Sequence, residues 1–363
     1  MFVAWRDLRF AAGRFALMGV VVVLITLLVG LLSGLTAGLG QQNISAITGL
    51  PADRIAFAAP GEGQELAYSG STVTENQWRQ WASAPGVGTA EPLGITSLNA
   101  TAGDRSSGIS AFGVRPGSAL APDSETLTGH SAVLSGAAAE SLGVRSGDTI
   151  TVAGQELAVT SVAGDAFFSH TPVVWTNLDV WQHTAPPGSG GDTATVIALT
   201  TSDDTSDGVI EATDEAAGTV TVSTEDSLAA IGSYTSENGS LQLMRGFLFV
   251  ISALVIGAFF TVWTIQRSGD IAVLKALGAT TAGLLKDALG QAVVLLTGGT
   301  LVGTGLAAGL GAVISGSTVP FVLDPATVLV PAAVLILLGV LGAAVAIRRI
   351  TSVDPLTALG SAR

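Results

Sequence analysis

The chain has three histidines, His130, His170 and His183, whose imidazoles could bind a metal ion or exchange a proton near neutral pH. They lie far apart in the sequence, and no HExxH pair, nucleophile elbow or paired-histidine spacing accompanies them. Because the chain contains no cysteine, thiolate metal sites, catalytic thiols and disulfides are excluded. We therefore expect each histidine to be a surface or hydrogen-bonded residue, and we expect no catalytic residue and no resident metal in this chain.

Both lysines of the chain, Lys275 and Lys286, lie in one short polar segment, 266–287, between two long apolar runs. Neither lysine belongs to a GxxxxGK[ST] sequence, so the chain has no phosphate-binding loop and no ATPase motif of its own. The chain is therefore not expected to be an enzyme, and any ATP would be bound by a separate partner subunit. The formal net charge of −13 argues against a nucleic-acid partner, which would require a basic surface.

The elements that must position these residues begin with four apolar runs, each long enough to cross a bilayer. A helix needs about 20 apolar residues to span the hydrocarbon core. The mean hydropathy of +0.58 agrees with a membrane protein that also has a soluble part. The predicted transmembrane helices cover 15–39, 243–265, 288–316 and 326–347.

The basic residues near these spans predict the orientation, because positively charged flanks are retained in the cytoplasm. Arginine and lysine occur in the amphipathic segment 1–14, in the connection 266–287 and in the tail 348–363. We therefore expect a multi-pass protein of the cell membrane with both termini in the cytoplasm. Residues 40–242, with 23 acidic residues against five arginines, form one large domain outside.

The external domain has the pattern of a mixed α/β fold, in which short β-type runs alternate with turn residues. A helix is predicted at 74–84, where Trp78 and Trp81 share a face and are expected to pack in the core. A second helix is predicted at 131–142. A β-hairpin around the turn AGQ is predicted within 143–164. The fold class is thus one plus three transmembrane helices, with an α/β domain inserted between the first and the second.

Small residues recur in the first span, where Gly30, Gly34 and Gly38 are spaced by four. This spacing places them on one helical face and allows another helix to approach closely. A contact between two copies of the chain and a contact within one copy would look identical in the sequence. The third span, 288–316, is richer still in glycine, and we expect static packing there rather than a moving gate.

The connection between the second and third spans contains a short amphipathic helix, predicted at 268–278 and stopped by Gly278. Ile271 and Leu274 line one face, while Lys275 projects elsewhere. A helix of about 16 Å, at about 1.5 Å per residue, is marginal alone in water. It must therefore dock, either on the membrane surface or in a groove of a partner.

The same connection carries the pattern R-x-x-[ED]-I-x-x-L-[KR]-A-[LI]-G-A, which resembles the coupling segment of MacB/FtsX-type permeases, also called type VII ABC transporters. The order of spans and the tail V-D-P-x-x-A-L at 353–359 are similar to that family too. Members usually have Glu where this chain has Asp270. The resemblance assigns ATPase coupling to Arg267, Asp270, Ile271, Leu274, Lys275 and Gly278.

What this resemblance implies is a homodimer in the lipid membrane, bound to two copies of a cytosolic ABC ATPase. ATP binding would clamp the coupling helices and move the transmembrane and external parts as one mechanical unit, a mechanism called mechanotransmission. Other cargoes known from the family remain open alternatives: a lipoprotein, a peptide or a drug. A non-transporting signal transmitter to a cell-wall hydrolase is disfavoured by the large external domain and the short N-terminal segment.

A narrower resemblance points to haem exporter permeases. It rests on SGLxxGLxxxNIS at 33–45, IxSY at 231–234, FSHT at 168–171 and Val-Pro-Phe at 319–321. The substrate implied is haem, whose iron is bound in proteins by His, Cys, Met or Tyr. Tyr234, from the SY stretch, is the first candidate ligand; Met244 and His170 are further candidates, and the carboxylate of Glu237 could contribute. Relatives often have a tyrosine where this chain has Phe167 and Phe168.

Overall fold

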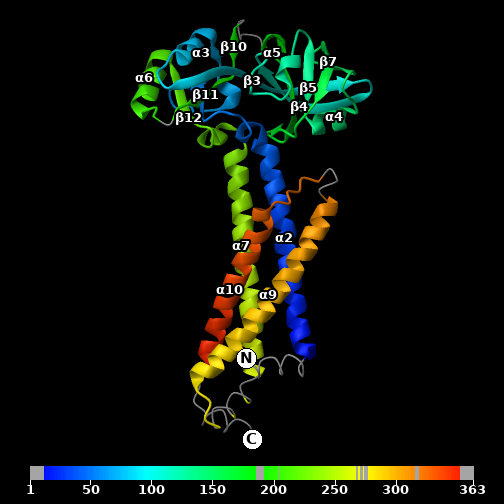
Figure 1. The fold of residues 1–363 in the computed structure, drawn as a ribbon, viewed down its shortest axis with the longest axis vertical. Helices are drawn as coiled ribbons and strands as arrows, with labels where there is room; N and C mark the ends of the chain where they lie inside the picture. Colours follow the sequence, from blue (N-terminus) through cyan, green and yellow to red (C-terminus); the bar gives the residue numbers. More distant parts are fainter. Residues whose placement is uncertain are drawn as a thin grey trace. The chain divides into compact units, whose positions relative to one another are not determined.

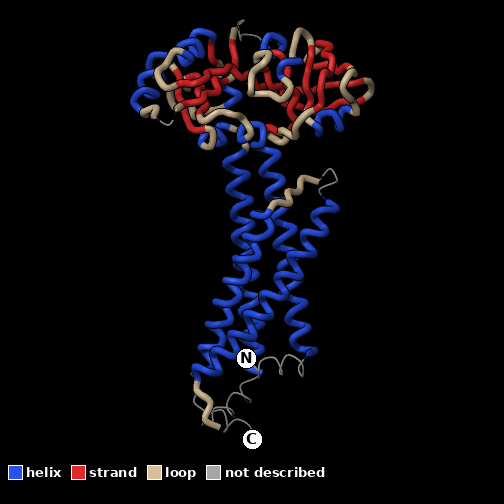
Figure 2. Tube along the Cα trace, viewed as in Figure 1, coloured by secondary structure: helices blue, strands red, loops and turns tan. Residues whose placement is uncertain are grey.

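The computed structural model describes residues 12–184, 192–202, 204–266, 269, 273, 277–314 and 319–351. The chain divides into two compact units. The membrane unit consists of Met1–Leu39 and Ser240–Arg363, and the external unit is Gly40–Gly239. Figure 1 gives the element labels, and Figure 2 shows that the strands are confined to the external unit.

The membrane unit contains the four helices that are long and apolar enough to cross a membrane among the described residues. These are α2 (Ala12–Thr48), α7 (Tyr234–Gln266), α9 (Thr281–Ile314) and α10 (Pro325–Thr351). They confirm the predicted arrangement of one helix followed by three. Each helix extends beyond the apolar run that predicted it, because a helix can continue into polar flanks. Lys286 accordingly lies near the start of α9 and not in an extended connection.

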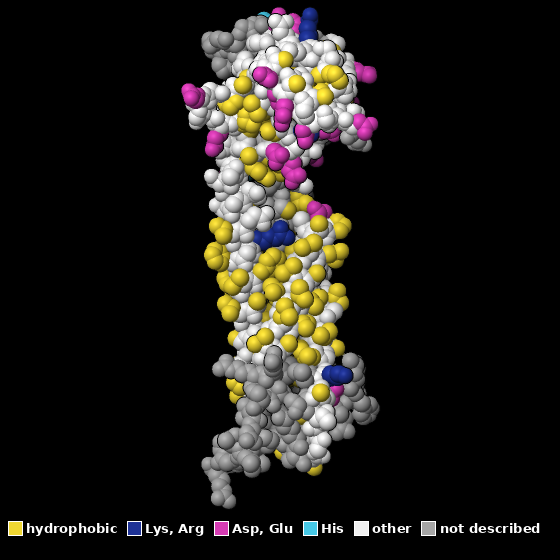
Figure 3. Space-filling view, turned by 90° about the vertical axis from the view of Figure 1, so that its left-hand side faces the viewer, with side chains coloured by type: hydrophobic (Ala, Val, Ile, Leu, Met, Phe, Trp, Pro, Cys, Tyr) yellow, Lys and Arg dark blue, Asp and Glu magenta, His cyan; other side chains and the backbone are white. Residues whose placement is uncertain are grey.

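The core of the membrane unit is an apolar cluster to which all four helices contribute. Aromatic side chains come from α7, where Phe260 and Trp263 meet edge to face at 6.0 Å between ring centroids. Met18 and Val22 of α2 join the cluster, and α9 supplies Leu296. Figure 3 shows hydrophobic side chains over the spanning helices and acidic side chains over the external unit, as the charge distribution predicts.

The external unit is built on one sheet with the strand order β12-β1-β11-β3-β4-β9-β5-β7-β6. Strand β6 also pairs with the far end of β3, so that β3, β4, β9, β5, β7 and β6 form a closed ring of pairings. The bounds are β1 Arg54–Ala58, β3 Val87–Ala102, β4 Arg105–Val114, β5 Ser131–Leu134, β6 Thr149–Val152, β7 Gln155–Val162, β9 Thr171–Asn177, β11 Val196–Thr201 and β12 Thr219–Ser223.

Shorter elements complete the external unit and confirm its mixed α/β class. The short strand β8 pairs with β9, and β2 pairs with β10. The helices flank the strands (Figure 1). The bounds are β2 Val73–Thr74, β8 Phe167–Phe168, β10 Thr193–Ala194, α3 Glu75–Ala82, α4 Gly136–Leu142, α5 Leu178–Thr184 and α6 Asp207–Ala217.

Two of the local predictions for this unit are confirmed. In α3, the backbone N–H of Thr74 donates to Gln77 Oε1 at 2.7 Å as in a capping box, and Trp78 and Trp81 are buried. Strands β6 and β7 form the predicted hairpin. Its turn is Ala153-Gly154, because Gln155 already pairs with Val152; both turn residues have positive φ, 48° and 80°.

The predicted helix at 131–142 is wrong in its first third. Residues Ser131–Leu134 form β5, which is buried along its length between β7 and β9. Only Gly136–Leu142 is helical, and Ser135 caps it by accepting a hydrogen bond from the N–H of Ala138 at 3.3 Å. A short apolar run buried on both faces has no period of two, so its pattern does not distinguish a strand from a helix.

An aromatic core inside the external unit holds the chain ends of this unit together. Phe57, Tyr68, Phe112 and Phe168 meet edge to face, and Tyr68 donates to Ser227 Oγ at 2.9 Å. Burial raises the pKa of the Tyr68 phenol. The same cluster includes residues from the end of α2 and, at its margin, Tyr234 at the start of α7. It therefore fixes the segments that carry the candidate site.

Candidate functional site

A polar cluster joins the last turns of α2, the first turn of α7 and the turn between β8 and β9. Glu237 of α7 is its centre. The Oε2 atom of Glu237 accepts a hydrogen bond from Asn43 Nδ2 at 2.9 Å and lies 2.6 Å from His170 Nε2. An ionised carboxylate only accepts hydrogen bonds, so Nε2 of His170 carries a proton in this arrangement. All three residues belong to the external unit.

The turn that presents His170 is held in a left-handed backbone conformation. Ser169 and His170 have φ values of 49° and 63°, which non-glycine residues adopt only when their surroundings enforce it. Two backbone hydrogen bonds supply that enforcement: Ser169 N donates to Asn43 O and His170 N donates to Gln42 O, each at 2.9 Å. Phe168, buried in the aromatic core, anchors the turn from the other side.

The electrostatics of the cluster favour the ionised carboxylate. Glu237 lies outside the predicted span 243–265, and hydrogen bonds from Ser233 and then from His170 hold its pKa below the usual 4.5. The Glu237 and His170 side chains are 38% and 36% exposed, so a ligand can reach them. Asn43 is only 2% exposed, and its Oδ1 has no hydrogen-bond partner among the described residues. One buried acceptor is therefore unused in this site.

The structure groups the candidate haem ligands unevenly. His170 and Glu237 are in contact, and Tyr234 precedes Glu237 by three residues on α7, which places both on one helical face. Met244 is 48% exposed and belongs to the membrane unit. Sequence reasoning missed Asn43, although it begins the NIS triplet that the resemblance already contained.

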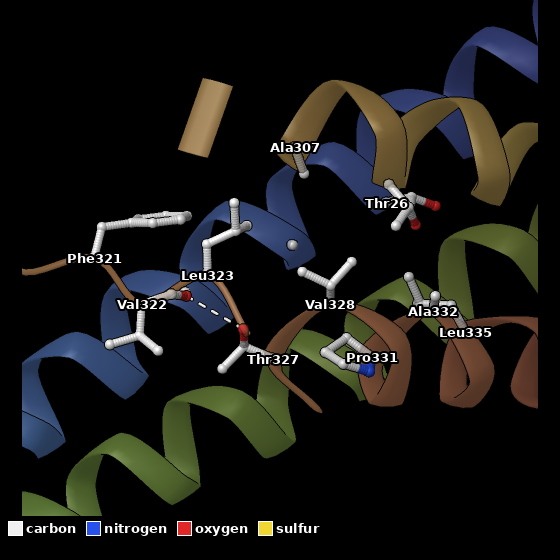
Figure 4. Close-up of a pocket in the computed structure, with 13 residues that line it drawn as sticks. Thr26, Ala307, Phe321, Val322, Leu323, Thr327, Val328, Pro331, Ala332 and Leu335 are labelled. Carbon is white, nitrogen blue, oxygen red and sulfur yellow. Dashed lines mark hydrogen bonds between the residues drawn. The ribbon is translucent and has the colours of Figure 1, made fainter. Parts of the chain in front are cut away.

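The glycines of the first span pack within the chain. A Cβ at Gly30 would lie 2.8 Å from Ala307 of α9, a Cβ at Gly34 would overlap the ring of Phe321, and one at Gly38 would overlap the carbonyl of Pro320. In addition, Val322 N donates to Gly34 O at 3.1 Å. Figure 4 shows Phe321 and Val322 beside this helix, with the hydrogen bond from Thr327 Oγ1 to Val322 O at 3.2 Å. The glycine face of α2 is thus occupied by α9 at Gly30 and by the segment before α10 at Gly34 and Gly38.

The glycines of α9 fall into two groups. A Cβ at Gly299 would lie 2.8 Å from Val22, one at Gly303 would lie 2.7 Å from Thr26, and one at Gly311 would lie 2.5 Å from Phe321. By contrast, Gly298, Gly305 and Gly309 have no atom within 4 Å of such a Cβ. The close approaches show the tight packing that small residues permit between spanning helices.

An apolar groove of about 1030 Å³ lies between α7 and α10. The two helices lie close together where Gly342 faces Gly257, with 3.5 Å between a Cβ built at Gly342 and the Cα of Gly257. Exposed side chains line the groove, among them Leu254 at 67% and Val345 at 71%. The groove can take an apolar or amphipathic molecule, but it offers few polar groups.

Most of the coupling residues lie outside the described residues: Arg267, Asp270, Ile271, Leu274 and Lys275. Gly278 is described and has a φ of 96°, the left-handed geometry that ends a helix. Just before it, Leu277 N donates to Val273 O at 3.0 Å, as in a helical turn. Leu277 and Val273 are 79% and 56% exposed, so apolar surface is available here for a partner.

These features define an integral membrane protein with one plus three spanning helices and a large external α/β domain. Comparison with protein families identifies its kind. The MacB-like periplasmic core domain family matches residues 15–216, and the FtsX-like permease C-terminal family matches residues 243–355. The chain therefore belongs to the MacB/FtsX-type permeases of ABC transporters. A permease of this class works with an ATPase that is a separate subunit.

Three relatives are each named as permeases. The chain is 26% identical over 373 aligned positions to a permease named HrtB, assigned by its name to a hemin transport system, from Staphylococcus haemolyticus (strain JCSC1435), with 99% of each chain covered. A permease of the same name from Staphylococcus epidermidis (strain ATCC 12228 / FDA PCI 1200) is 32% identical to this chain over 146 residues, which cover 39% of this chain and 41% of that relative. An uncharacterized ABC transporter permease of Mycobacterium tuberculosis (strain ATCC 25618 / H37Rv) is 25% identical, with 99% of each covered.

Solved structures resemble the chain only distantly. The periplasmic region of MacB from Actinobacillus actinomycetemcomitans has 15% identity and a TM-score of 0.37, covering 50% of this chain and 92% of that one. The extracellular domain of YknZ, a transporter from Gram-positive bacteria, has 13% identity and a TM-score of 0.35, covering 47% and 98%.

Proposed function

We propose that this chain is the permease of an ATP-driven exporter that removes haem from the membrane. Two copies of the chain would assemble with two copies of a cytosolic ATPase, with both termini on the cytoplasmic side. The ATPase would bind and hydrolyse ATP, and the permease would transmit its motion to the external unit. Haem is a substrate in this proposal and not a resident cofactor.

The observation that carries the proposal is the cluster of Asn43, His170 and Glu237, with Tyr234 one helical turn away. It offers a phenol, a carboxylate and an imidazole on segments that a buried aromatic core holds in place. These groups are of the types that bind haem iron or orient such a ligand. The sequence likeness to permeases named for hemin transport supports the same substrate.

We infer different roles for the members of this cluster. Nε2 of His170 is already hydrogen-bonded to Glu237, so His170 can bind iron through Nε2 only after that contact opens. Tyr234 takes no part in that contact, and Oε1 of Glu237 is not the atom that His170 and Asn43 share. We therefore assign iron binding to Tyr234 and Glu237, and the orientation of Glu237 to His170 and Asn43.

ATPase coupling is proposed for the segment 268–278. The described part of this segment exposes Val273 and Leu277, next to the helix-ending Gly278. Driving a two-state element from 1:99 to 99:1 requires about 5.5 kcal/mol of differential binding. Burial of several apolar side chains against the ATPase is of that order, since a fully buried Leu or Val contributes about 1.5–3 kcal/mol.

Haem titration of the detergent-purified full chain, followed by Soret absorbance, tests the proposal. We expect saturable binding to the wild type, weaker binding to Tyr234→Phe and Glu237→Gln, and unchanged binding to Tyr68→Phe, a matched control in the buried core. No saturable spectrum in the wild type would overturn haem as the substrate and favour another family cargo. Saturable binding that neither site variant weakens would overturn only the assignment of ligands.

A further inference from the structure

Two of the three histidines line one pocket of the external unit, away from the cluster of Asn43, His170 and Glu237. The pocket has a volume of about 240 Å³. Its polar lining consists of His130, Gln155, Asn177, Asp179 and His183. Neither the permease family nor the proposed haem site accounts for this grouping.

The fold brings the two imidazoles to one edge of the sheet. Strands β5 and β9 are antiparallel, with Ala132 opposite Thr176. His130 directly precedes β5 and α5 directly follows β9, so both lie at this same end of the strand pair. Asp179 and His183 follow on α5 with a spacing of four, which puts them on the same helical face.

Hydrogen bonding fixes which nitrogen of His183 is available. Its Nδ1 lies 2.7 Å from the backbone carbonyl oxygen of Asp179. A carbonyl oxygen only accepts, so Nδ1 carries the proton and Nε2 carries the lone pair. Histidines that bind metal ions are commonly oriented in this way, because the ring nitrogen that does not bind the metal donates a hydrogen bond to a backbone carbonyl. The His130 side chain has no hydrogen-bond partner among the described residues, so its imidazole is also available.

We propose that this pocket binds a divalent transition-metal ion through the imidazoles of His130 and His183. Imidazole is a preferred ligand of Zn²⁺, Cu²⁺ and Ni²⁺. The 23 acidic residues against five arginines in 40–242 attract cations to the external unit. No group of three or more His, Cys, Asp or Glu that could hold a metal ion occurs among the described residues, so the proposed site has two protein ligands and leaves the remaining positions to water. The site is therefore open and exchangeable, unlike a closed structural zinc site.

Zinc titration by calorimetry tests this site on the detergent-purified full chain, isolated with a tag that contains no histidine. We expect one Zn²⁺ site in the wild type, and we expect its affinity to fall at least about tenfold in His130→Ala and in His183→Ala. Replacing a residue that only orients a metal ligand already lowers metal affinity about 10–100-fold. His170→Gln, which alters the histidine outside the pocket, should bind Zn²⁺ like the wild type.

Two results would overturn the proposal. The first is equal Zn²⁺ binding by the wild type and the His130→Ala/His183→Ala double variant. The second is a loss in His170→Gln as large as in the pocket variants, which would place the ion at the Glu237 cluster instead. Neither result depends on whether haem is the transported substrate, so failure of this site leaves the haem proposal standing.

Discussion

Replacement of Gly34 by alanine tests whether the glycine face of α2 is an internal contact. An added Cβ would overlap the Phe321 ring, with 2.7 Å to Cε2 and 2.8 Å to Cε1. Overpacking of this kind typically costs about 1–3 kcal/mol. The replacement also gains about 1 kcal/mol from helix propensity, because glycine is unfavourable inside a helix. The net change expected is therefore a destabilisation of up to about 2 kcal/mol.

Gly309→Ala is the matched control, because a Cβ at Gly309 meets no atom within 4 Å. It keeps the propensity gain and lacks the overlap, so the two variants should differ by the overpacking cost of about 1–3 kcal/mol. The assay is equilibrium unfolding of the full chain in mixed micelles. Phe321→Ala completes a double-mutant cycle: in that background the Gly34→Ala penalty should largely disappear.

Equal stability of Gly34→Ala and Gly309→Ala would refute the internal contact. A penalty that persists in the Phe321→Ala background would refute it in another way, since the added methyl group would then meet something other than Phe321. A Gly34→Ala variant that loses self-association while keeping its unfolding free energy would indicate that the glycine face contacts a second copy of the chain.

Three further predictions concern the other sites. Leu274→Asp should abolish association with the ATPase in co-purification while the chain stays folded; retained association would contradict the proposed docking face. Because the pKa of Glu237 is lowered in the folded chain, its cluster adds stability that is fully present above pH 4.5 and is lost as the pH falls below that value. The difference in unfolding free energy between the wild type and Glu237→Gln should therefore shrink in acid. A difference that stays constant with pH would contradict this. Trp81→Ala should destabilise the external unit by about 3–5 kcal/mol, since Trp81 is fully buried and its Nε1 donates to Thr219 Oγ1 at 3.0 Å. Trp81→Phe should cost less, because it keeps an aromatic ring in the core. Equal shifts of the thermal midpoint in the two variants would contradict this packing.

The parts of this fold that the sequence predicts correctly depend on neighbouring residues. The four spanning helices follow from the length of apolar runs, and the β6–β7 hairpin follows from alternation around Ala153-Gly154. The strand β5 could not be predicted in this way, because Ser131–Leu134 is buried on both faces and its neighbours β7 and β9 follow later in the chain.

The candidate site was only partly predictable for the same reason. Asn43 and Glu237 are 194 positions apart, and His170 and Glu237 are 67 apart, so no local pattern connects them. Individual residue types nominated His170 and Glu237, but not their contact. The grouping of His130 with His183 was likewise hidden, because it arises from the register of β5 with β9 and from the helix that follows β9.

The contact between His170 and Glu237 places a constraint on any ligand that binds there. A ligand that drew Oε2 of Glu237 away from both partners would leave the Asn43 amide, 2% exposed, without its acceptor, which is costly for a buried polar group. It would also release one restraint on the left-handed turn at Ser169 and His170. A ligand that binds Glu237 through its other oxygen avoids both costs. Asn43→Ala should therefore weaken haem binding less than Glu237→Gln does in the Soret titration. The opposite order would show that Asn43 contacts the ligand itself.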